Sequence, residues 1–393
     1  MNNIRVGFYL KNKRISQIDC RNIDRGNPGI GGTFYAMISL IYYLNLFKTS
    51  SFVFKTYLEA KMMLPSDINA TLVDSTNELG KFILHDNIDI LVVSRINELD
   101  ANEELFSSIS KLKCKVIIWA HTFIPPRWIN YYSRNLKIVK VVCVGKEQLG
   151  LLLDHELYEK SMYIFNGVNC NDSLYKIDNQ RENVVTYIGS LSPHKGFHLL
   201  AKSWKKVLKV VPDATLNVIG TGQLYDRKTK LGKYGLAEKY YEKLFVKYIL
   251  DSSGNILPSV RFLGILGVEK KDVLNKTKVG VPNPSGLTET FGYTAIELQL
   301  AGCSIVTKKC PGYLDTVYKE SGILLDKTSP YQLANAIISL LQREGYNSNK
   351  TVQFIKDNFS FQVITKKWFD LFLAVYNDNI VDNTPPLLFT TRE

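Results

Sequence analysis

The sequence predicts an α/β protein built from two doubly wound domains with parallel sheets. Short apolar runs alternate with longer amphipathic stretches, and this alternation begins again after about residue 180. The runs themselves are almost continuously apolar, which is typical of parallel strands whose sheet is covered by helices on both faces. The length of 393 residues also favours two or three domains.

The predicted elements follow one another in a regular order. In the first half, strands are expected at 4–10, 88–93, 116–120 and 139–144, and a helix is expected at 34–46. In the second half, strands are expected at 184–189, 215–220, 260–263, 279–282 and 303–307. Helices are expected between them at 196–210, 236–249, 291–301 and 330–342. A final helix is predicted at 361–376, where apolar residues recur at helical spacing.

A polar stretch without periodicity, residues 169–183, separates the two halves and is predicted to be a linker. It divides an N-terminal domain, 1–168, from a C-terminal domain, 184–360. The helix at 361–376 is a candidate to pack back on the first domain, and we assign no structure to the tail, 377–393. Two domains joined in this way would leave a cleft at the carboxyl ends of their strands, where open α/β sheets bind ligands.

The composition is that of a basic globular protein. Hydrophobic residues make up 45% and charged residues 22%, which argues against disorder, collagen and coiled coil. The 49 Lys and Arg exceed the 37 Asp and Glu, and a net charge of +12 favours anionic partners. The six cysteines are scattered without a CxxC pair, and neither a signal peptide nor an apolar run of about 18 residues is visible. We therefore expect a soluble cytoplasmic protein without a zinc ribbon or a thioredoxin-like site.

The strongest functional signal is the segment NPSGLTETFGYTAIELQLAGCSIVT, residues 283–307. Its loop carries Glu289, and the helix that follows carries Glu297, no more than about 12 Å away. Because the unpaired N–H groups of a helix N-terminus attract anions, the segment suits a diphosphate flanked by two carboxylates. One carboxylate would bind sugar hydroxyls and the other ribose hydroxyls. The two glutamates alone would favour an ordinary amphipathic helix, but the Pro-Ser-Gly loop and Phe291-Gly292 favour the site.

Three weaker signals accompany it. YIGSLSPHKG, residues 187–196, places Lys195 where it could pair with phosphate, although a solvated lysine is an equal alternative and no Walker A loop is present. GNPGIGGT, residues 26–33, allows close approach to a phosphate, but the strict GxGxxG pattern fails and a flexible loop is the favoured alternative. His121 follows the strand VIIWA and would point into the cleft, whereas a lone histidine is more often structural.

Other site classes lack their patterns. The histidines show no zinc-ligand spacing, and the nucleophile elbow G-x-S-x-G of a serine hydrolase is missing. No RNP, KH or helix-turn-helix signature is present, so nucleic acid is not an expected partner. The stretch 127–140 interleaves basic and aromatic residues, which suits an anionic lipid surface. The alternative is a solvated helix face whose aromatic side chains lie in the core.

Taken together, these segments resemble the GT-B glycosyltransferases and, more narrowly, the retaining glycosyltransferase family 4 (glycosyl transferases group 1). PSGLTETFGYTAIE carries the E-x7-E element of that family, and YIGSLSPHKGF is similar to its Lys-Gly element. IFNGVN, residues 164–169, resembles its interdomain segment, GIGGT its N-domain glycine loop and WAHTF its histidine strand. The resemblance spans nearly the whole chain, is weak before residue 116, and implies two Rossmann-like domains with sheets facing across a cleft.

The resemblance also implies roles for individual residues. Lys195, Glu289 and His121 would be catalytic: Lys195 would neutralise the diphosphate, Glu289 would hold the transferred sugar, and His121 would line the sugar pocket. Glu297 would hold the ribose.

The remaining donor-binding positions are backbone or small residues. The N–H groups of Phe291 and Gly292 would assist at the diphosphate, and Gly31 and Gly32 would approach it from the other domain. Ser190 stands where the family usually has an arginine, so a second phosphate cation is unassigned and Arg261 is the candidate substitute. The Gly-Gly that the family has after the 303–307 strand is Pro311-Gly312 here.

The sequence therefore predicts a retaining hexosyltransferase that uses a nucleoside-diphosphate sugar and needs no metal or other cofactor. The expected acceptor is a saccharide or lipid-linked saccharide of bacterial surface polysaccharide synthesis, with peripheral association at the cytoplasmic face of an anionic membrane. Two alternatives remain: a GT-B epimerase or phosphorylase, and an inactive protein that binds sugar nucleotides.

Overall fold

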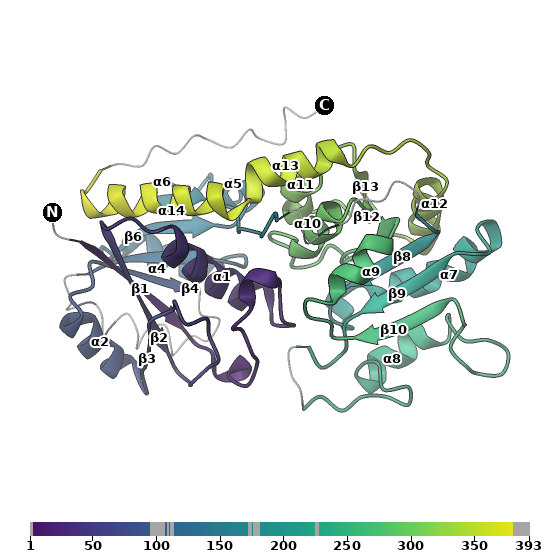
Figure 1. Cartoon of the computed structure of the whole chain (residues 1–393), viewed down its shortest axis with the longest axis horizontal. Helices are drawn as coiled ribbons and strands as arrows, with labels where there is room; N and C mark the ends of the chain where they lie inside the picture. The colour runs from purple at the N-terminus through teal and green to yellow at the C-terminus, as the bar shows by residue number, and fades with distance from the viewer. Residues whose placement is uncertain are drawn as a thin grey trace. The chain divides into compact units, whose positions relative to one another are not determined.

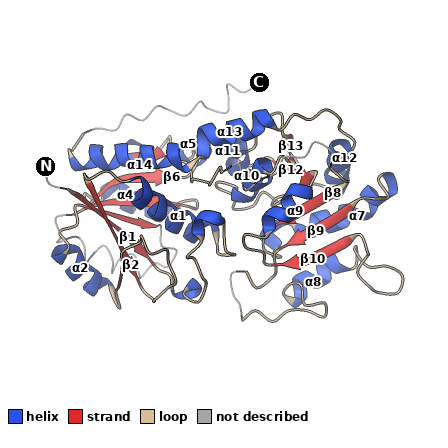
Figure 2. Cartoon of the chain, viewed as in Figure 1, coloured by secondary structure: helices blue, strands red, loops and turns tan. Residues whose placement is uncertain are grey.

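The computed structural model describes residues 3–94, 107, 110, 114–171, 175, 181–224 and 228–379. The chain divides into two compact units, each containing one parallel sheet (Figures 1 and 2). The first unit comprises Met1–Asp24, Gly32–Asn169 and Phe359–Glu393, and the second comprises Arg25–Gly31 and Cys170–Asn358. The short segment Arg25–Gly31, which the sequence analysis assigned to the domain 1–168, thus groups with the second unit, where Gly29 lies against Ile265.

The first unit is built on a seven-stranded sheet of order β3-β2-β1-β4-β5-β6-β7, in which every pairing is parallel. Its strands are β1 (Ile4–Leu10), β2 (Phe52–Leu58), β3 (Ala70–Leu72), β4 (Ile90–Ser94), β5 (Lys115–Ala120), β6 (Ile138–Cys143) and β7 (Ser161–Tyr163). Its helices are α1 (Gly32–Phe47), α2 (Thr76–His85), α4 (Pro126–Arg134), α5 (Lys146–Gly150), α6 (Leu157–Lys160) and α14 (Phe361–Tyr376). Short 3-10 turns occupy Lys13–Ile15 and Ile23–Arg25.

Helix α14 is a structural part of the first unit although it comes last in the chain. It packs on β1, β4 and α1. The buried indole of Trp368 lies 4.9 Å from that of Trp119 in β5, and the ring of Phe361 stacks on Tyr43 in α1 at 3.8 Å. These contacts explain why apolar residues recur along the helix at helical spacing: they form the face that covers the sheet.

The second unit is built on a six-stranded parallel sheet of order β10-β9-β8-β11-β12-β13. Its strands are β8 (Val184–Ile188), β9 (Thr215–Ile219), β10 (Val260–Gly264), β11 (Val279–Gly280), β12 (Ser304–Lys308) and β13 (Gly322–Leu325). Its helices are α7 (Phe197–Val210), α8 (Lys239–Val246), α9 (Lys270–Lys276), α10 (Tyr293–Leu300), α11 (Pro311–Thr316), α12 (Pro330–Leu341) and α13 (Asn349–Phe359). A 3-10 turn, Pro193–Lys195, lies between β8 and α7.

Both strand orders are those of a doubly wound sheet, so the predicted fold class is confirmed. In each sheet the chain first moves outward on one side and then returns to build the other side. The point of reversal lies between β1 and β4 in the first unit and between β8 and β11 in the second. In open α/β sheets, ligands bind outside the carboxyl ends of the strands at this point.

In the stretch 127–140 the structure agrees with the second interpretation, a helix face whose aromatic side chains lie in the core. It divides into α4 and the start of β6, and the rings of Trp128 and Tyr132 are buried in the core of the first unit. Lys140 is also buried. The exposed positions of α4 include Arg127 and Arg134.

Within the described part of the chain, none of the helices combines the length and the apolar character needed to span a bilayer.

Candidate active site

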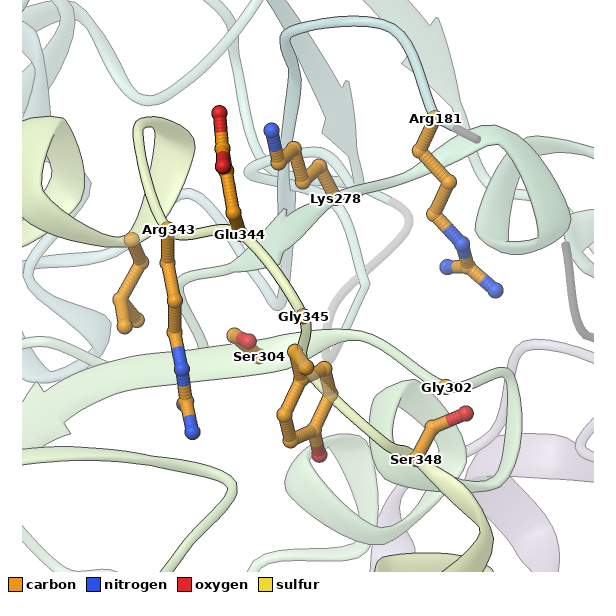
Figure 3. Close-up of a pocket in the computed structure, with 10 residues that line it drawn as sticks. Arg181, Lys278, Gly302, Ser304, Arg343, Glu344, Gly345 and Ser348 are labelled. Atoms are coloured by element: carbon orange, nitrogen blue, oxygen red, sulfur yellow. The ribbon is translucent and has the colours of Figure 1, made fainter. Parts of the chain in front are cut away.

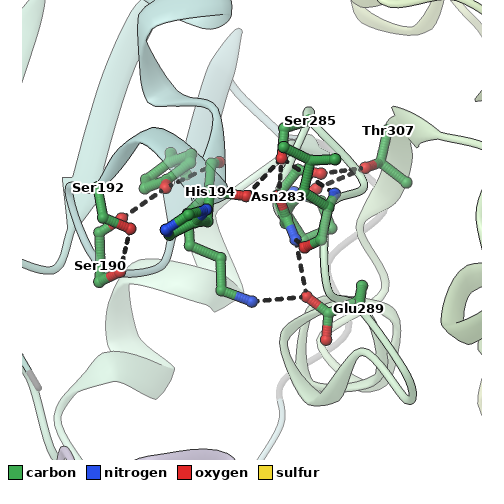
Figure 4. A network of polar contacts seen from close by, with 11 residues as sticks. Ser190, Ser192, His194, Asn283, Ser285, Glu289 and Thr307 are labelled. Atoms are coloured by element: carbon green, nitrogen blue, oxygen red, sulfur yellow. Dashed lines mark hydrogen bonds and ion pairs between the residues drawn. The ribbon is translucent and has the colours of Figure 1, made fainter. Parts of the chain in front are cut away.

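The two residues with the strongest predicted roles meet at the carboxyl edge of the second sheet. Lys195 ends the turn that follows β8, and Glu289 lies in the loop that follows β11, the neighbouring strand. The Nζ atom of Lys195 lies 2.9 Å from Oε2 of Glu289 (Figure 4). The two side chains are 19% and 15% exposed, so the pair is partly shielded but still reached by solvent. This place is the switch point of the sheet, between β8 and β11.

The turn that carries Lys195 is fastened to the Glu289 loop through the backbone. Gly196 has a φ of +69°, and a Cβ at this position would lie 2.6 Å from the backbone nitrogen of Ser285. The hydroxyl of Ser285 donates a hydrogen bond to the carbonyl oxygen of His194. The buried hydroxyl of Tyr187 in β8 donates to the carbonyl oxygens of Ser190 at 3.0 Å and Lys195 at 3.2 Å. The ammonium group is therefore held in place by its own turn.

Asn283 is a functional candidate that the sequence analysis did not single out. Its buried amide nitrogen donates to Oε2 of Glu289 at 3.0 Å and to the carbonyl oxygen of Leu287 at 3.1 Å. Its backbone carbonyl accepts a hydrogen bond from Thr307 in β12 at 3.1 Å (Figure 4). One carboxylate oxygen of Glu289 thus accepts from both an ammonium and an amide, which fixes its orientation.

Backbone strain is concentrated in the same loop. Asn283 has a φ of +30° and Thr288 a φ of +56°. Positive φ is unfavourable for residues other than glycine and persists where the surrounding contacts enforce it, often at functional sites. An asparagine directly after the strand expected at 279–282 is the sequence signal that could have identified Asn283.

The N-terminus of α10 lies next to Glu289 in the chain and has the features of an anion site. Gly292 has a φ of +85° at the N-cap, where a Cβ would come within 2.7 Å of the Tyr313 ring. The N-cap residue itself, a glycine, has no side chain that could cap this end of the helix. The positive end of the helix dipole at this place favours an anionic ligand. Phe291, just before the cap, is buried and packs against the ring of Tyr293 at 5.0 Å.

Glu297, the second carboxylate of the predicted pair, forms an ion pair that the sequence did not indicate. Its Oε1 accepts from Nζ of Lys270 in α9 at 2.7 Å. Both residues are only 8% exposed, so each charge is largely removed from water. Lys270 begins the sequence KKD after a glutamate, which looks like the solvated face of a short helix, and for this reason it was missed.

The position of the usual arginine does not supply a second cation. Ser190 is buried and its hydroxyl lies 2.9 Å from that of Ser192. Arg261, the predicted substitute, is the second residue of β10 and is exposed. In the register of the sheet, Arg261 lies opposite Asn217 of β9, and Asn217 lies opposite Thr186, which is in the middle of β8 and not at its carboxyl end. The structure therefore does not place Arg261 at the edge where Lys195 lies.

Three predicted residues remain. Gly32 begins α1 of the first unit, and Gly31 ends the segment that groups with the second. His121 directly follows β5 of the first unit, and its ring lies 4.3 Å from that of Trp119. Burial lowers the pKa of His121 to about 3, so its imidazole is neutral near pH 7. A neutral imidazole can donate or accept a hydrogen bond but supplies no charge.

Residues 175–358 match the family model described as Glycosyl transferases group 1. This part of the chain, just under half of it, is similar to the domain that the model describes. It contains Lys195, Glu289 and Glu297 together with the whole second sheet. The match supports sugar transfer as the reaction, with a transferase of this class as the enzyme.

Comparison with other proteins extends the likeness to nearly the whole chain. An uncharacterized glycosyltransferase of Haemophilus influenzae is 22% identical over 332 residues, 80% of this chain and 84% of its own length. A glycosyltransferase structure from Rickettsia africae has a TM-score of 0.71 at 14% identity and covers 96% of this chain and 100% of its own. The pneumococcal O-GlcNAc transferase GtfA in complex with UDP and GlcNAc has a TM-score of 0.58 at 15% identity, over 76% of this chain and 60% of its own. At such identities the structures establish the fold, which is GT-B.

Proposed function

We propose that the protein is a retaining glycosyltransferase of family 4 that transfers a hexose from a nucleoside-diphosphate sugar to a hydroxyl acceptor. The observation that carries this proposal is the Lys195–Glu289 ion pair at the switch point of the sheet, close in the chain to the N-terminus of α10, where the N-cap is a glycine. A cation and a helix N-terminus suit a diphosphate, and a neighbouring carboxylate suits sugar hydroxyls.

Lys195 and α10 would act on the charge that develops during the reaction. Departure of the nucleoside diphosphate is the difficult step, because negative charge builds on the oxygen that leaves the anomeric carbon. The ammonium group and the N–H groups at Phe291 and Gly292 oppose that charge without reorganising, an electrostatic role that is often the largest part of catalysis. The acceptor would attack from the face that the diphosphate leaves, so retention requires no protein nucleophile.

The ion pair suggests how the donor takes its place. Without donor, Glu289 balances the charge of Lys195 at 2.9 Å and Asn283 holds the same carboxylate oxygen. The diphosphate would replace Glu289 as the partner of Lys195. The carboxylate would then accept hydrogen bonds from hydroxyl groups of the sugar, while Asn283 keeps it oriented. Glu297, oriented by Lys270, would bind the ribose hydroxyls.

We further propose that transfer needs neither a metal ion nor another cofactor, because Lys195 and α10 supply the positive charge at the diphosphate. Incubation with EDTA should leave the rate unchanged. Loss of activity on chelation, with recovery on addition of Mg²⁺ or Mn²⁺, would contradict this part of the proposal.

The proposed acceptor is a saccharide or lipid-linked saccharide of bacterial surface polysaccharide synthesis, reached at the cytoplasmic face of an anionic membrane. The outward face of α4, with Arg127 and Arg134, and the 90% exposed Leu136 beside it support such an association. Cosedimentation with vesicles that contain phosphatidylglycerol should capture the protein at low salt. Equal capture by neutral phosphatidylcholine vesicles would contradict an electrostatic contact.

The central experiment combines donor identification with a variant at the ion pair. A thermal-shift panel of UDP, GDP, ADP and dTDP should show one selective stabilisation, which names the base of the donor. With sugars on that nucleotide, Lys195→Ala should lower transfer by about 10²–10³-fold, as expected for loss of an electrostatic contact to the leaving group. Lys205→Ala, which removes an exposed lysine of α7, is the matched control and should retain activity.

Three results would overturn the proposal. Near wild-type transfer by Lys195→Ala would remove its basis. Conversion of the nucleotide sugar without an acceptor would indicate an epimerase, and stabilisation by a nucleotide without any turnover would indicate a binding protein. The anomeric configuration of the first product, followed by proton NMR, decides between retention and inversion.

A further inference from the structure

Two lysine side chains of the first unit come together near the carboxyl edge of its sheet. Lys146 begins α5, shortly after the end of β6, and Lys367 lies in the middle of α14. The Nζ atom of each lies 5.9 Å from the centre of the Phe165 ring, which follows β7 in the chain. The Nζ atom of Lys146 lies at the same distance from the ring of Tyr163, the last residue of β7. We call Lys146 and Lys367 the lysine pair.

The lysine pair carries two positive charges that no carboxylate of the described residues balances. Across the part of the chain that the structure describes, neither lysine takes part in an ion pair. Both side chains are half-buried, and burial, followed by the charge of Lys146, lowers the pKa of Lys367. A cation over an aromatic ring gains about 0.5–2 kcal/mol, but the ring does not neutralise its charge. The fold therefore holds two like charges together against their repulsion and their lost hydration.

Two guanidinium groups at the amino edge of the second sheet show the usual alternative, in which backbone oxygens hold a cation. Arg181, Lys278 and Arg343 line a hollow at that edge (Figure 3). Arg181 donates to the carbonyl oxygens of Thr277 and Ala301, and Arg343 donates to a carbonyl oxygen at 3.0 Å. Within the described residues, the contacts of the lysine pair are with aromatic rings, which do not replace the oxygen acceptors that an ammonium group prefers.

We propose that the lysine pair binds a phosphate group of the acceptor. This inference rests on the proposed transferase function. It narrows the acceptor to the lipid-linked saccharides, in which phosphate or diphosphate joins the sugar to the lipid. A diphosphate linkage carries two negative charges, which match the two ammonium groups, and its oxygens are strong acceptors for lysine. Open α/β sheets bind ligands beyond the carboxyl ends of their strands, where Lys146 and Phe165 lie.

The same chemistry would serve a free anion, so the test uses two probes. Inorganic pyrophosphate carries the anionic group alone, whereas geranyl diphosphate carries it on a short isoprenyl chain. An acceptor site should bind geranyl diphosphate at least as tightly as pyrophosphate. The half-buried ring of Tyr163 beside Lys146 offers the chain an apolar contact that pyrophosphate cannot use.

The measurement is NMR of the full chain after reductive methylation, which places labelled methyl groups on each lysine and keeps its charge. Lys146→Arg and Lys367→Arg identify the two signals by their loss. Both signals should move in a saturable manner during titration with either probe and should give one common dissociation constant. Lys146→Gln should weaken the binding reported by the Lys367 signal by at least about tenfold, because a hydrogen bond between charged groups is lost.

Lys366→Gln is the matched control, because Lys366 is the exposed neighbour of Lys367 on α14 and the change in charge is the same. It should leave binding at the lysine pair unchanged, and thermal midpoints show whether each variant is folded. Immobile signals, or two different dissociation constants, would overturn the shared site. Tighter binding of pyrophosphate than of geranyl diphosphate would overturn its assignment to the acceptor. Failure of the transferase proposal would instead appear as unchanged transfer by Lys195→Ala, which these signals do not report.

Discussion

The Lys270–Glu297 pair allows a quantitative test of the candidate site. At 2.7 Å, two unit charges attract each other by about 6 kcal/mol at an effective dielectric constant of about 20. Removal of each ion from water opposes this by several kcal/mol, so the pair contributes little net stability. Loss of one partner leaves an uncompensated buried charge and should lower the free energy of unfolding by about 3–5 kcal/mol.

The assay is a double-mutant cycle with methionine, which approximates the length of both side chains. Lys270→Met and Glu297→Met should each lower the urea midpoint of unfolding by about 1–1.7 M, for an m-value of about 3 kcal/mol per M. The double variant should recover most of this loss, because both charges are then absent. If Lys270→Met alone were as stable as the wild type, or if the two losses simply added, the inferred pair would be refuted.

A binding measurement separates the role of the pair in stability from its role in recognition. The wild type should bind the selected nucleoside diphosphate more tightly than its 2′,3′-dideoxy analogue, because Glu297 is proposed to bind the ribose hydroxyls. The double variant should be stable yet bind the two nucleotides equally. Retained discrimination in that variant would show that Glu297 does not contact the ribose.

Four further outcomes are expected. Because the pKa of His121 is lowered in the folded state, protonation of its imidazole favours the unfolded state. About 5 kcal/mol of folding stability is therefore present above pH 6.5 and is lost as the pH falls towards 3. His121→Gln removes this titration and should give a shallower acid unfolding curve. Gly292→Ala should be more destabilising by at least about 2 kcal/mol than Gly235→Ala in urea unfolding, because both positions have positive φ but only Gly292 is crowded. Trp368→Ala should lower the thermal midpoint of the first unit by about 10 °C, as expected for a buried indole in α14. Glu289→Gln should bind the nucleoside diphosphate more tightly than the wild type in calorimetry while losing transfer; weaker binding would contradict the exchange of partners at Lys195.

Elements with one dominant local signal were predicted well from the sequence. The final helix was placed at the residues that it occupies, because its apolar face repeats regularly and Ser360 marks its start. The central strands of both sheets were placed within one or two residues, because buried parallel strands are continuously apolar. Strand β2 was missed, since Lys55 and Thr56 interrupt its apolar run, and the helix at 236–249 proved shorter because Glu238 caps it.

The site was only partly accessible from the sequence, for a physical reason. Lys195 and Glu289 stand 94 positions apart and were linked through family resemblance, not through local pattern. Lys270 gave no signal and Asn283 only that of its place after a strand, because their importance depends on contacts made by the fold. The composition of the basic and aromatic stretch at 127–140 left two interpretations open, and the fold decides between them: Trp128 and Tyr132 lie in the core, while the stretch keeps an exposed basic side. The type of a residue indicates which roles it can take, and its burial in the folded protein decides whether it serves the core, the surface or the site.

The ion pairs of Lys195 and Lys270 explain how a basic protein could avoid binding anions unselectively at its candidate active site. The chain carries a net charge of +12, yet Lys195 and Lys270 are each balanced by a glutamate. A bare phosphate must compete with Glu289 for Lys195 and leaves that carboxylate without a partner. A nucleotide sugar supplies phosphate oxygens to Lys195 and sugar hydroxyls to Glu289 at once, so both groups remain satisfied. Selectivity would then arise from the cost of separating the pair, which the correct donor alone offsets.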